Sequence, residues 1–175
     1  MTRRNPFMAK QSTPRRGSNN SPSVAPPDVA TTDALIRAMY ESVSFPPGSQ
    51  PDFDRLRALF HPDGRIIPPR AERGAELEVL DVEEFISRSR VDVVSTGLER
   101  RGFQEQEIAR RSAVFGSMVH ILSTYESRYT LADPAPFQRG INSIQLVQDS
   151  YRFWILSILW EAERPGNPIP KAFLS

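Results

Sequence analysis

Residues 137–163, FQRGINSIQLVQDSYRFWILSILWEAE, decide the fold of this chain. Apolar and polar residues alternate on both sides of Asp149-Ser150, which is typical of two antiparallel β-strands joined by a tight turn. We expect these strands over about 138–148 and 151–162. If Asp149 and Ser150 are the central turn residues, Asn142 lies opposite Ser157.

This register divides the hairpin into two faces. The first is apolar except for Asn142 and Ser157, and we expect it to line the core and the floor of a pocket. Buried polar side chains need hydrogen-bond partners, so these two either satisfy each other or contact a ligand. The second face is aromatic and amphipathic, which suits an interface between subunits. The candidate interface residues are Arg139, Gln145, Trp154 and Trp160.

A second hairpin is expected upstream, with strands over about 103–114 and 117–130. If Phe115 and Gly116 are its central turn residues, Arg111 lies opposite His120 and Glu107 lies opposite Thr124. These polar pairs predict an outer face, and Tyr125 then points to the core. On this register His120 is a surface residue and a weak candidate for a general base, although its unperturbed pKa is near neutrality.

Helical signals precede the strands. Apolar residues recur at helical spacing over 32–43 and 51–60. A third helix is expected to begin after Asp81, because Glu84 completes a capping-box pattern. Helices followed by an antiparallel meander predict an α+β domain with the helices on one face of a curved sheet.

Composition sets further limits. The chain has 175 residues, a formal net charge of +1 and no cysteine. The absence of cysteine excludes disulfides, thiolate metal sites and cysteine nucleophiles, and it agrees with a cytoplasmic location. No apolar run is long enough to span a bilayer, and the balanced charge gives no reason to expect nucleic acid as a partner. Residues 1–30 are basic and proline-rich, so we expect a disordered tail before a domain over 31–175.

Four segments, 59–64, 115–126, 139–146 and 154–161, resemble the nuclear transport factor 2-like superfamily. This cone-shaped α+β fold includes SnoaL-like polyketide cyclases and ketosteroid isomerase, and the four segments together resemble an uncharacterised bacterial branch of it. The resemblance covers about 31–174. It implies three N-terminal helices packed on a strongly curved, mainly antiparallel sheet, with a central pocket. It also implies a homodimer through the outer sheet face.

The expected function is the binding of a small apolar organic ligand in this pocket. The candidate ligand contacts are Tyr40, His61, Tyr125, Asn142 and Ser157. Two alternatives remain open, since the fold hosts unrelated functions. One is an isomerase, dehydratase or cyclase that uses general acid–base chemistry with His61, Tyr125 or a pocket carboxylate. The other is a non-catalytic homodimeric interaction module.

Catalytic residues are not assigned by the sequence. Two histidines without an acidic cluster at ligand spacing do not predict a metal site. The sequence contains no glycine-rich phosphate loop and no nucleotide fingerprint. We therefore expect neither a metal nor a cofactor.

Overall fold

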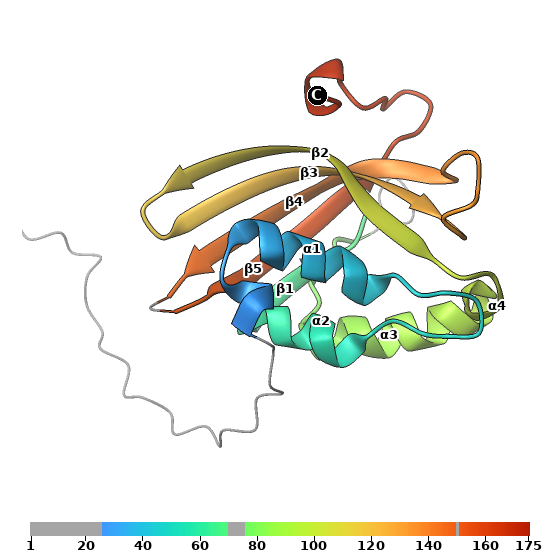
Figure 1. The fold of residues 1–175 in the computed structure, drawn as a ribbon, viewed down its shortest axis with the longest axis horizontal. Helices are drawn as coiled ribbons and strands as arrows, with labels where there is room; N and C mark the ends of the chain where they lie inside the picture. Colours follow the sequence, from blue (N-terminus) through green and yellow to red (C-terminus); the bar gives the residue numbers. More distant parts are fainter. Residues whose placement is uncertain (1–25, 70–75, 150) are drawn as a thin grey trace, which may run out of the picture.

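The computed structural model describes residues 26–69, 76–149 and 151–175. Helices cover one face of a curved sheet, and the C-terminal segment lies on the other side (Figure 1). The sheet has five strands in the order β1-β5-β4-β3-β2. β1 is parallel to β5, and every other neighbouring pair is antiparallel. The strands are β1 (Phe60–Ile67), β2 (Gln104–Phe115), β3 (Met118–Arg128), β4 (Gln138–Gln148) and β5 (Phe153–Ala162).

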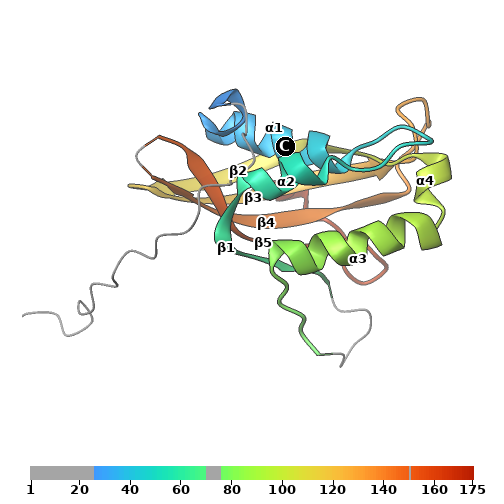
Figure 2. The same ribbon diagram turned by 90° about the horizontal axis from the view of Figure 1, so that it is seen from below.

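Three main helices, α1 (Thr32–Val43), α2 (Phe53–Leu59) and α3 (Val82–Ser95), cover the same face of the sheet, which is turned toward the viewer in Figure 2. Local capping explains where two of them begin. The Thr31 side chain accepts a hydrogen bond from the backbone of Ala34, and Asp81 forms the expected capping box with Glu84. The short helix α4 (Leu98–Arg101) leads into β2. The predicted α+β class and the helical layer on one face are confirmed.

The folded unit begins earlier than residue 31. Residues of the expected tail form a 3₁₀ helix, η1 (Pro26–Val29). Asp28 pairs with Arg55 at 2.9 Å, and Val29 is buried in the core. Residues 1–25, which carry the rest of the expected tail, lie outside the described residues.

The turn of the β2–β3 hairpin lies one residue later than predicted, which shifts the pairing next to the turn by two residues. Ala113, not Arg111, lies opposite His120, because the turn is centred on Gly116 and Ser117. Gly116 has φ +60°, which agrees with the glycine-first turns that favour two-residue hairpins. With an irregularity between Glu107 and Ala109, this shift places Glu107 opposite Tyr125. Glu107 therefore faces the helices and not the outer surface.

The β4–β5 register also differs from the prediction. The strands are joined after Gln148 by a longer connection, which includes the undescribed residue 150, and the pairing shifts between Gln145 and Leu146. As a result, Asn142 lies opposite Trp160, and Ser157 lies opposite Gln145. Ser157 is consequently on the outer face and Trp160 on the face toward the helices, the reverse of the expected arrangement. One extra residue in a strand has this effect because side chains alternate between faces.

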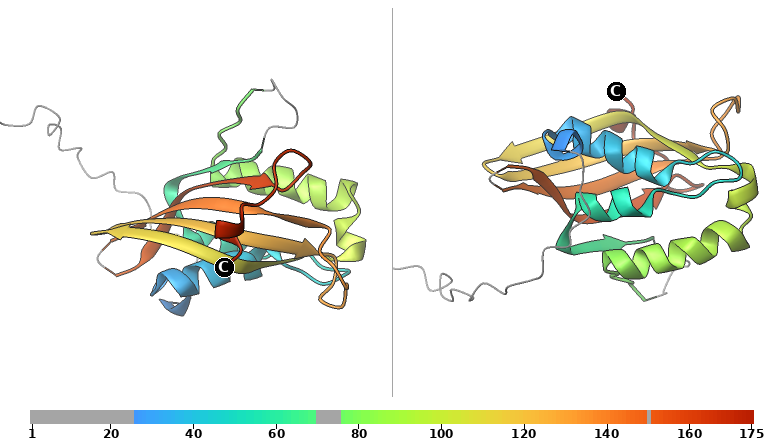
Figure 3. Two further views of the ribbon diagram at one scale, coloured as in Figure 1. Left: turned by 90° about the horizontal axis from the view of Figure 1, so that it is seen from above. Right: turned by 60° about the horizontal axis from the view of Figure 1, so that its bottom comes forward.

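The core lies between the helices and the concave face of the sheet. Its most deeply buried members include Leu35, Leu59, Ile121, Ile144 and Ile155. On the outer face, the C-terminal segment and its 3₁₀ helix η2 (Lys171–Phe173) cross over the strands (Figure 3). In the described part of the chain, no helix is long and apolar enough to cross a membrane.

Candidate functional site

A cavity of about 230 Å³ lies between the helices and the concave face of the sheet. Most of its lining is apolar: Met39, Val43, Leu56, Phe60, Ile66, Phe85, Phe103, Ile158 and Trp160. Four polar residues complete it: Glu105, Tyr125, Gln138 and Asn142. An apolar enclosure with a few fixed polar groups is the usual composition of a small-molecule site.

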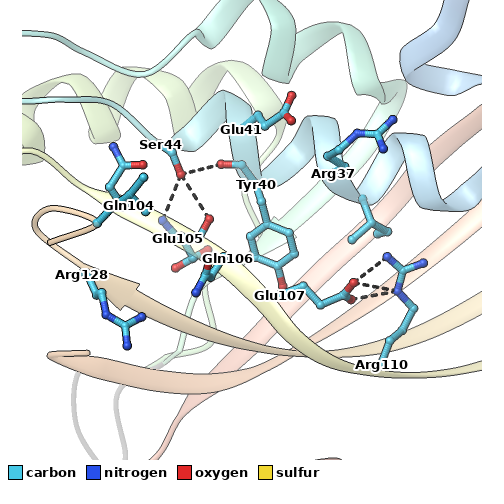
Figure 4. Close-up of a pocket in the computed structure, with 12 residues that line it drawn as sticks. Arg37, Tyr40, Glu41, Ser44, Gln104, Glu105, Gln106, Glu107, Arg110 and Arg128 are labelled. Carbon is cyan, nitrogen blue, oxygen red and sulfur yellow. Dashed lines mark hydrogen bonds and ion pairs between the residues drawn. The ribbon is translucent and has the colours of Figure 1, made fainter. Parts of the chain in front are cut away.

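Glu105 is the acidic residue of this cavity, and two serines hold it in place. The Glu105 backbone N–H donates to Ser44 Oγ at 3.0 Å, and the same Oγ donates to the Glu105 carbonyl at 3.2 Å (Figure 4). At the other end of the residue, Ser127 Oγ donates to the Glu105 carboxylate at 2.8 Å. Burial raises the pKa of the Glu105 carboxyl to about 7, and the Ser127 hydrogen bond offsets only part of this effect. The cavity therefore contains a carboxyl group that exchanges its proton near neutral pH.

Tyr125 lies on β3 with its ring directly over Gly140 of β4. A Cβ at residue 140 would lie 2.5 Å from the Tyr125 hydroxyl and would also clash with the Glu161 carbonyl, so only glycine fits there. Within the described residues the Tyr125 hydroxyl has no hydrogen-bond partner, and no fully buried side-chain oxygen or nitrogen is left without one. This hydroxyl therefore reaches the cavity. Burial, with the charges of Glu105 and Glu161, raises its pKa, so it remains a neutral donor.

Asn142 is held by a buried tyrosine from α1. Asn142 Nδ2 donates to the Tyr40 hydroxyl at 3.0 Å, and this hydroxyl also bonds Ser123 Oγ at 2.7 Å. Figure 4 shows the Tyr40 ring extending from α1 toward the sheet. Burial is the main cause that raises the pKa of Tyr40, so its phenol stays protonated. Tyr40 thus fixes Asn142 from behind the cavity.

The structure separates the predicted ligand contacts into two groups. Tyr125 and Asn142 line the cavity, and Tyr40 supports Asn142. Ser157 and His61 lie outside it. His61 follows the buried Phe60 in β1, so strand alternation turns its ring to the outer side, where it makes an edge contact with Trp154 at 5.8 Å.

Glu105, Gln138 and Trp160 were not anticipated as cavity residues. Trp160 packs edge-on against Phe85 at 6.4 Å and closes one side of the cavity. No signal in the sequence pointed to Glu105, because an irregularity in the strand pairing between Glu107 and Ala109 turns it toward the cavity. A turn centred on Gly116-Ser117 alone would pair Glu105 with Arg128, on the face opposite to Tyr125.

Three of the expected interface residues do lie on the outer face, where two of them have partners within the chain. Arg139 pairs with Glu163 at 2.7 Å. The Trp154 indole N–H donates to Asp149 at 2.7 Å. Gln145 is exposed, and His120, also on this face, bonds Ser143 at 3.0 Å. No group of three or more histidine or acidic residues in the described ranges is arranged to hold a metal ion.

Comparisons with known proteins agree with this architecture. No family model and no curated protein matches the sequence. Among solved structures, Aln2 from a Streptomyces species is similar over 74% of this chain and 86% of its own, at 16% identity and a TM-score of 0.54. An NTF-2 like protein of unknown function from Silicibacter pomeroyi covers 75% of this chain and 92% of its own, at 12% identity and a TM-score of 0.51. LinA is similar over 74% of this chain and 82% of its own, at 8% identity and a TM-score of 0.51.

These similarities define the fold of the chain. The chain has the nuclear transport factor 2-like fold, as its sequence segments suggested. At such low identities the similarity extends to the fold alone, so the function must be argued from the cavity.

Proposed function

We propose that this protein binds a small, largely apolar organic ligand in its cone cavity. The observation that carries the proposal is the arrangement of Glu105, Tyr125 and Asn142 within an otherwise apolar and aromatic enclosure. Polar groups fixed in this way orient a ligand, while the apolar walls supply most of the binding free energy.

A panel of small cyclic alcohols, ketones and phenols tests this proposal by thermal shift and calorimetry. A ligand that binds only the folded state stabilises it by about 2.7 kcal/mol at 100 times its dissociation constant. Val43→Phe fills the cavity and abolishes this stabilisation. Val94→Phe is the matched control, because Val94 is exposed on α3 and does not line the cavity. A panel that stabilises neither the wild type nor Val94→Phe contradicts the proposal.

A second candidate, a general acid–base enzyme, is favoured by Glu105. A carboxyl group with a pKa of about 7 accepts or donates a proton efficiently near neutral pH. In this chemistry the Glu105 carboxylate removes a proton from carbon next to a ligand carbonyl. The electron pair moves to the carbonyl oxygen, which the Tyr125 hydroxyl stabilises by donating a hydrogen bond.

Deuterium incorporation into small cyclic ketones in D₂O, followed by mass spectrometry, tests this second candidate. The exchange rate is expected to rise as the pH increases through about 7, because the base must be ionised. Glu105→Gln should abolish the exchange while retaining ligand binding. Equal exchange in the variant and the wild type excludes Glu105 as the base.

We also propose that the outer sheet face forms a homodimer. Met118 and Leu159 expose apolar surface there, beside Trp154, Gln145 and Arg139. Aromatic and arginine residues around exposed apolar groups are typical of protein interfaces. Dimer formation leaves the cavity accessible, because the two lie on opposite faces of the sheet.

A further inference from the structure

A hydrogen-bonded chain connects the cavity to the protein surface through the core. Asn142 Nδ2 bonds the Tyr40 hydroxyl, which bonds Ser123 Oγ at 2.7 Å. Ser123 Oγ donates to Glu107 Oε1 at 2.5 Å. Glu107 in turn binds Arg110, with contacts of 2.6 to 3.0 Å (Figure 4).

The charge on Glu107 fixes the direction of every hydrogen bond in this chain. Arg110 carries only donors, so both Glu107 oxygens accept, and the paired carboxylate has no proton to give. Ser123 must then donate to Glu107. Since the Ser123 hydroxyl has a single proton, its oxygen accepts from Tyr40. Tyr40 likewise has a single proton, so its oxygen accepts from Asn142.

This sequence of donors and acceptors sets the orientation of the Asn142 amide. The nitrogen must point to Tyr40, and the oxygen must point away from it. Asn142 Oδ1 has no protein partner among the described residues, where every fully buried side-chain oxygen is satisfied. The oxygen therefore reaches the cavity that Asn142 lines. Asn142 therefore presents a hydrogen-bond acceptor to the cavity, whereas an amide free to rotate could present either its oxygen or its nitrogen.

We propose that the cavity selects ligands that present a hydroxyl group to Asn142 Oδ1, and that Glu107 determines this preference. The inference rests on the proposed ligand-binding function and specifies its ligand class: compact apolar alcohols or phenols. Glu107 is a positioning residue, because it acts through Ser123 and Tyr40 and does not line the cavity. Ligands that offer only a carbonyl at this position leave Oδ1 without a donor.

Glu107→Gln reverses the chain. Arg110 still requires an acceptor, so the Gln oxygen faces Arg110 and its amide nitrogen faces Ser123. Ser123 then donates to Tyr40, and Tyr40 donates to the Asn142 oxygen, which turns the Asn142 nitrogen to the cavity. Glu126→Gln is the matched control, because it removes an ion-paired carboxylate, bound to Arg128, from the outer face of the same sheet.

Borneol and camphor are suitable probes, because they share one rigid carbon skeleton and differ at a single carbon. That carbon bears a hydroxyl group in borneol and a carbonyl oxygen in camphor. Calorimetry should show that the wild type and Glu126→Gln prefer borneol by about tenfold. This preference should be lost or reversed in Glu107→Gln. Ser123→Ala, which breaks the chain without changing a charge, should reduce the preference toward unity if Glu107→Gln does not fold. In the ligand-free wild type, NMR should show an NOE between the Asn142 side-chain amide protons and the Tyr40 ring, and Glu107→Gln should lose it.

The outcomes separate this inference from the function on which it rests. Equal affinity of the wild type for both probes, or a preference that survives in Glu107→Gln and Ser123→Ala, overturns the inference and leaves ligand binding intact. Failure of both probes to bind the wild type overturns the inference and counts against the ligand-binding function as well. An NOE that persists in Glu107→Gln shows that the amide is fixed by something other than Glu107 and overturns the inference.

Discussion

Glu105→Gln is expected to stabilise the protein at neutral and alkaline pH. Burial raises the pKa of the Glu105 carboxyl from 4.5 to about 7, so its ionised form is less stable in the folded state than in the unfolded state. At about 1.4 kcal/mol per pH unit, this difference corresponds to a cost of about 3 kcal/mol once the carboxyl is fully ionised. The Gln oxygen can still accept the Ser127 hydrogen bond and carries no charge.

The sign of the pH dependence follows from this raised pKa. At low pH the carboxyl is protonated in both states, and the variant and the wild type should be nearly equally stable. As the pH rises from about 4.5 to about 7, the unfolded state loses its proton first, and the wild type loses stability relative to the variant. Above about 7 the difference should remain constant.

Urea denaturation of both proteins across this pH range measures the effect. Glu126→Gln is the control with the opposite sign, because the Arg128 hydrogen bond lowers the pKa of Glu126. That variant should be destabilised at neutral pH, and the loss should disappear as the pH falls through the lowered pKa of Glu126. A Glu105→Gln variant that is destabilised, or whose difference from the wild type does not change with pH, refutes the argument for a buried proton-exchanging carboxyl.

Three further predictions concern neighbouring features. Gly140→Ala should destabilise by about 2 kcal/mol or more, measured by urea denaturation, because the new Cβ displaces the Tyr125 ring; an unchanged midpoint would contradict the close approach. Tyr40→Phe should cost about 1–3 kcal/mol in thermal or urea unfolding, since it leaves Asn142 without its acceptor, and a neutral effect would exclude a structural role for this hydroxyl. Trp154→Ala should weaken the proposed homodimer on the order of tenfold in sedimentation experiments, whereas a monomeric wild type would rule out that dimer.

Much of the fold could be predicted from the sequence because its signals are local. The spacing of apolar residues defined α1, and Asp81 with Glu84 defined the start of α3. Strand alternation identified β3 and β4 and placed Tyr125 and Asn142 on the concave face. Each of these features depends on residues within one helix or strand, and none requires the register between two strands to be known.

The remaining site residues could not be placed because they depend on register. The irregularity between Glu107 and Ala109 decides whether Glu105 faces the cavity or the outer surface. The bulge near Gln145 exchanges the faces of Ser157 and Trp160, and no local pattern in β5 marks it. A bulge forms when tertiary packing favours it, so a strand that is consistent with either face gives no sequence signal.

The central claim is that the cone cavity holds the ligand, with Tyr125 and Asn142 at its polar end. Isotope-filtered NMR on the labelled protein with unlabelled borneol tests it most directly, because it locates the ligand by proton contacts. The account predicts NOEs from borneol to the Tyr125 ring and to the Trp160 indole, which line the same cavity. NOEs confined to outer-face residues such as Trp154 and His61, or no NOE at saturating borneol, would contradict it.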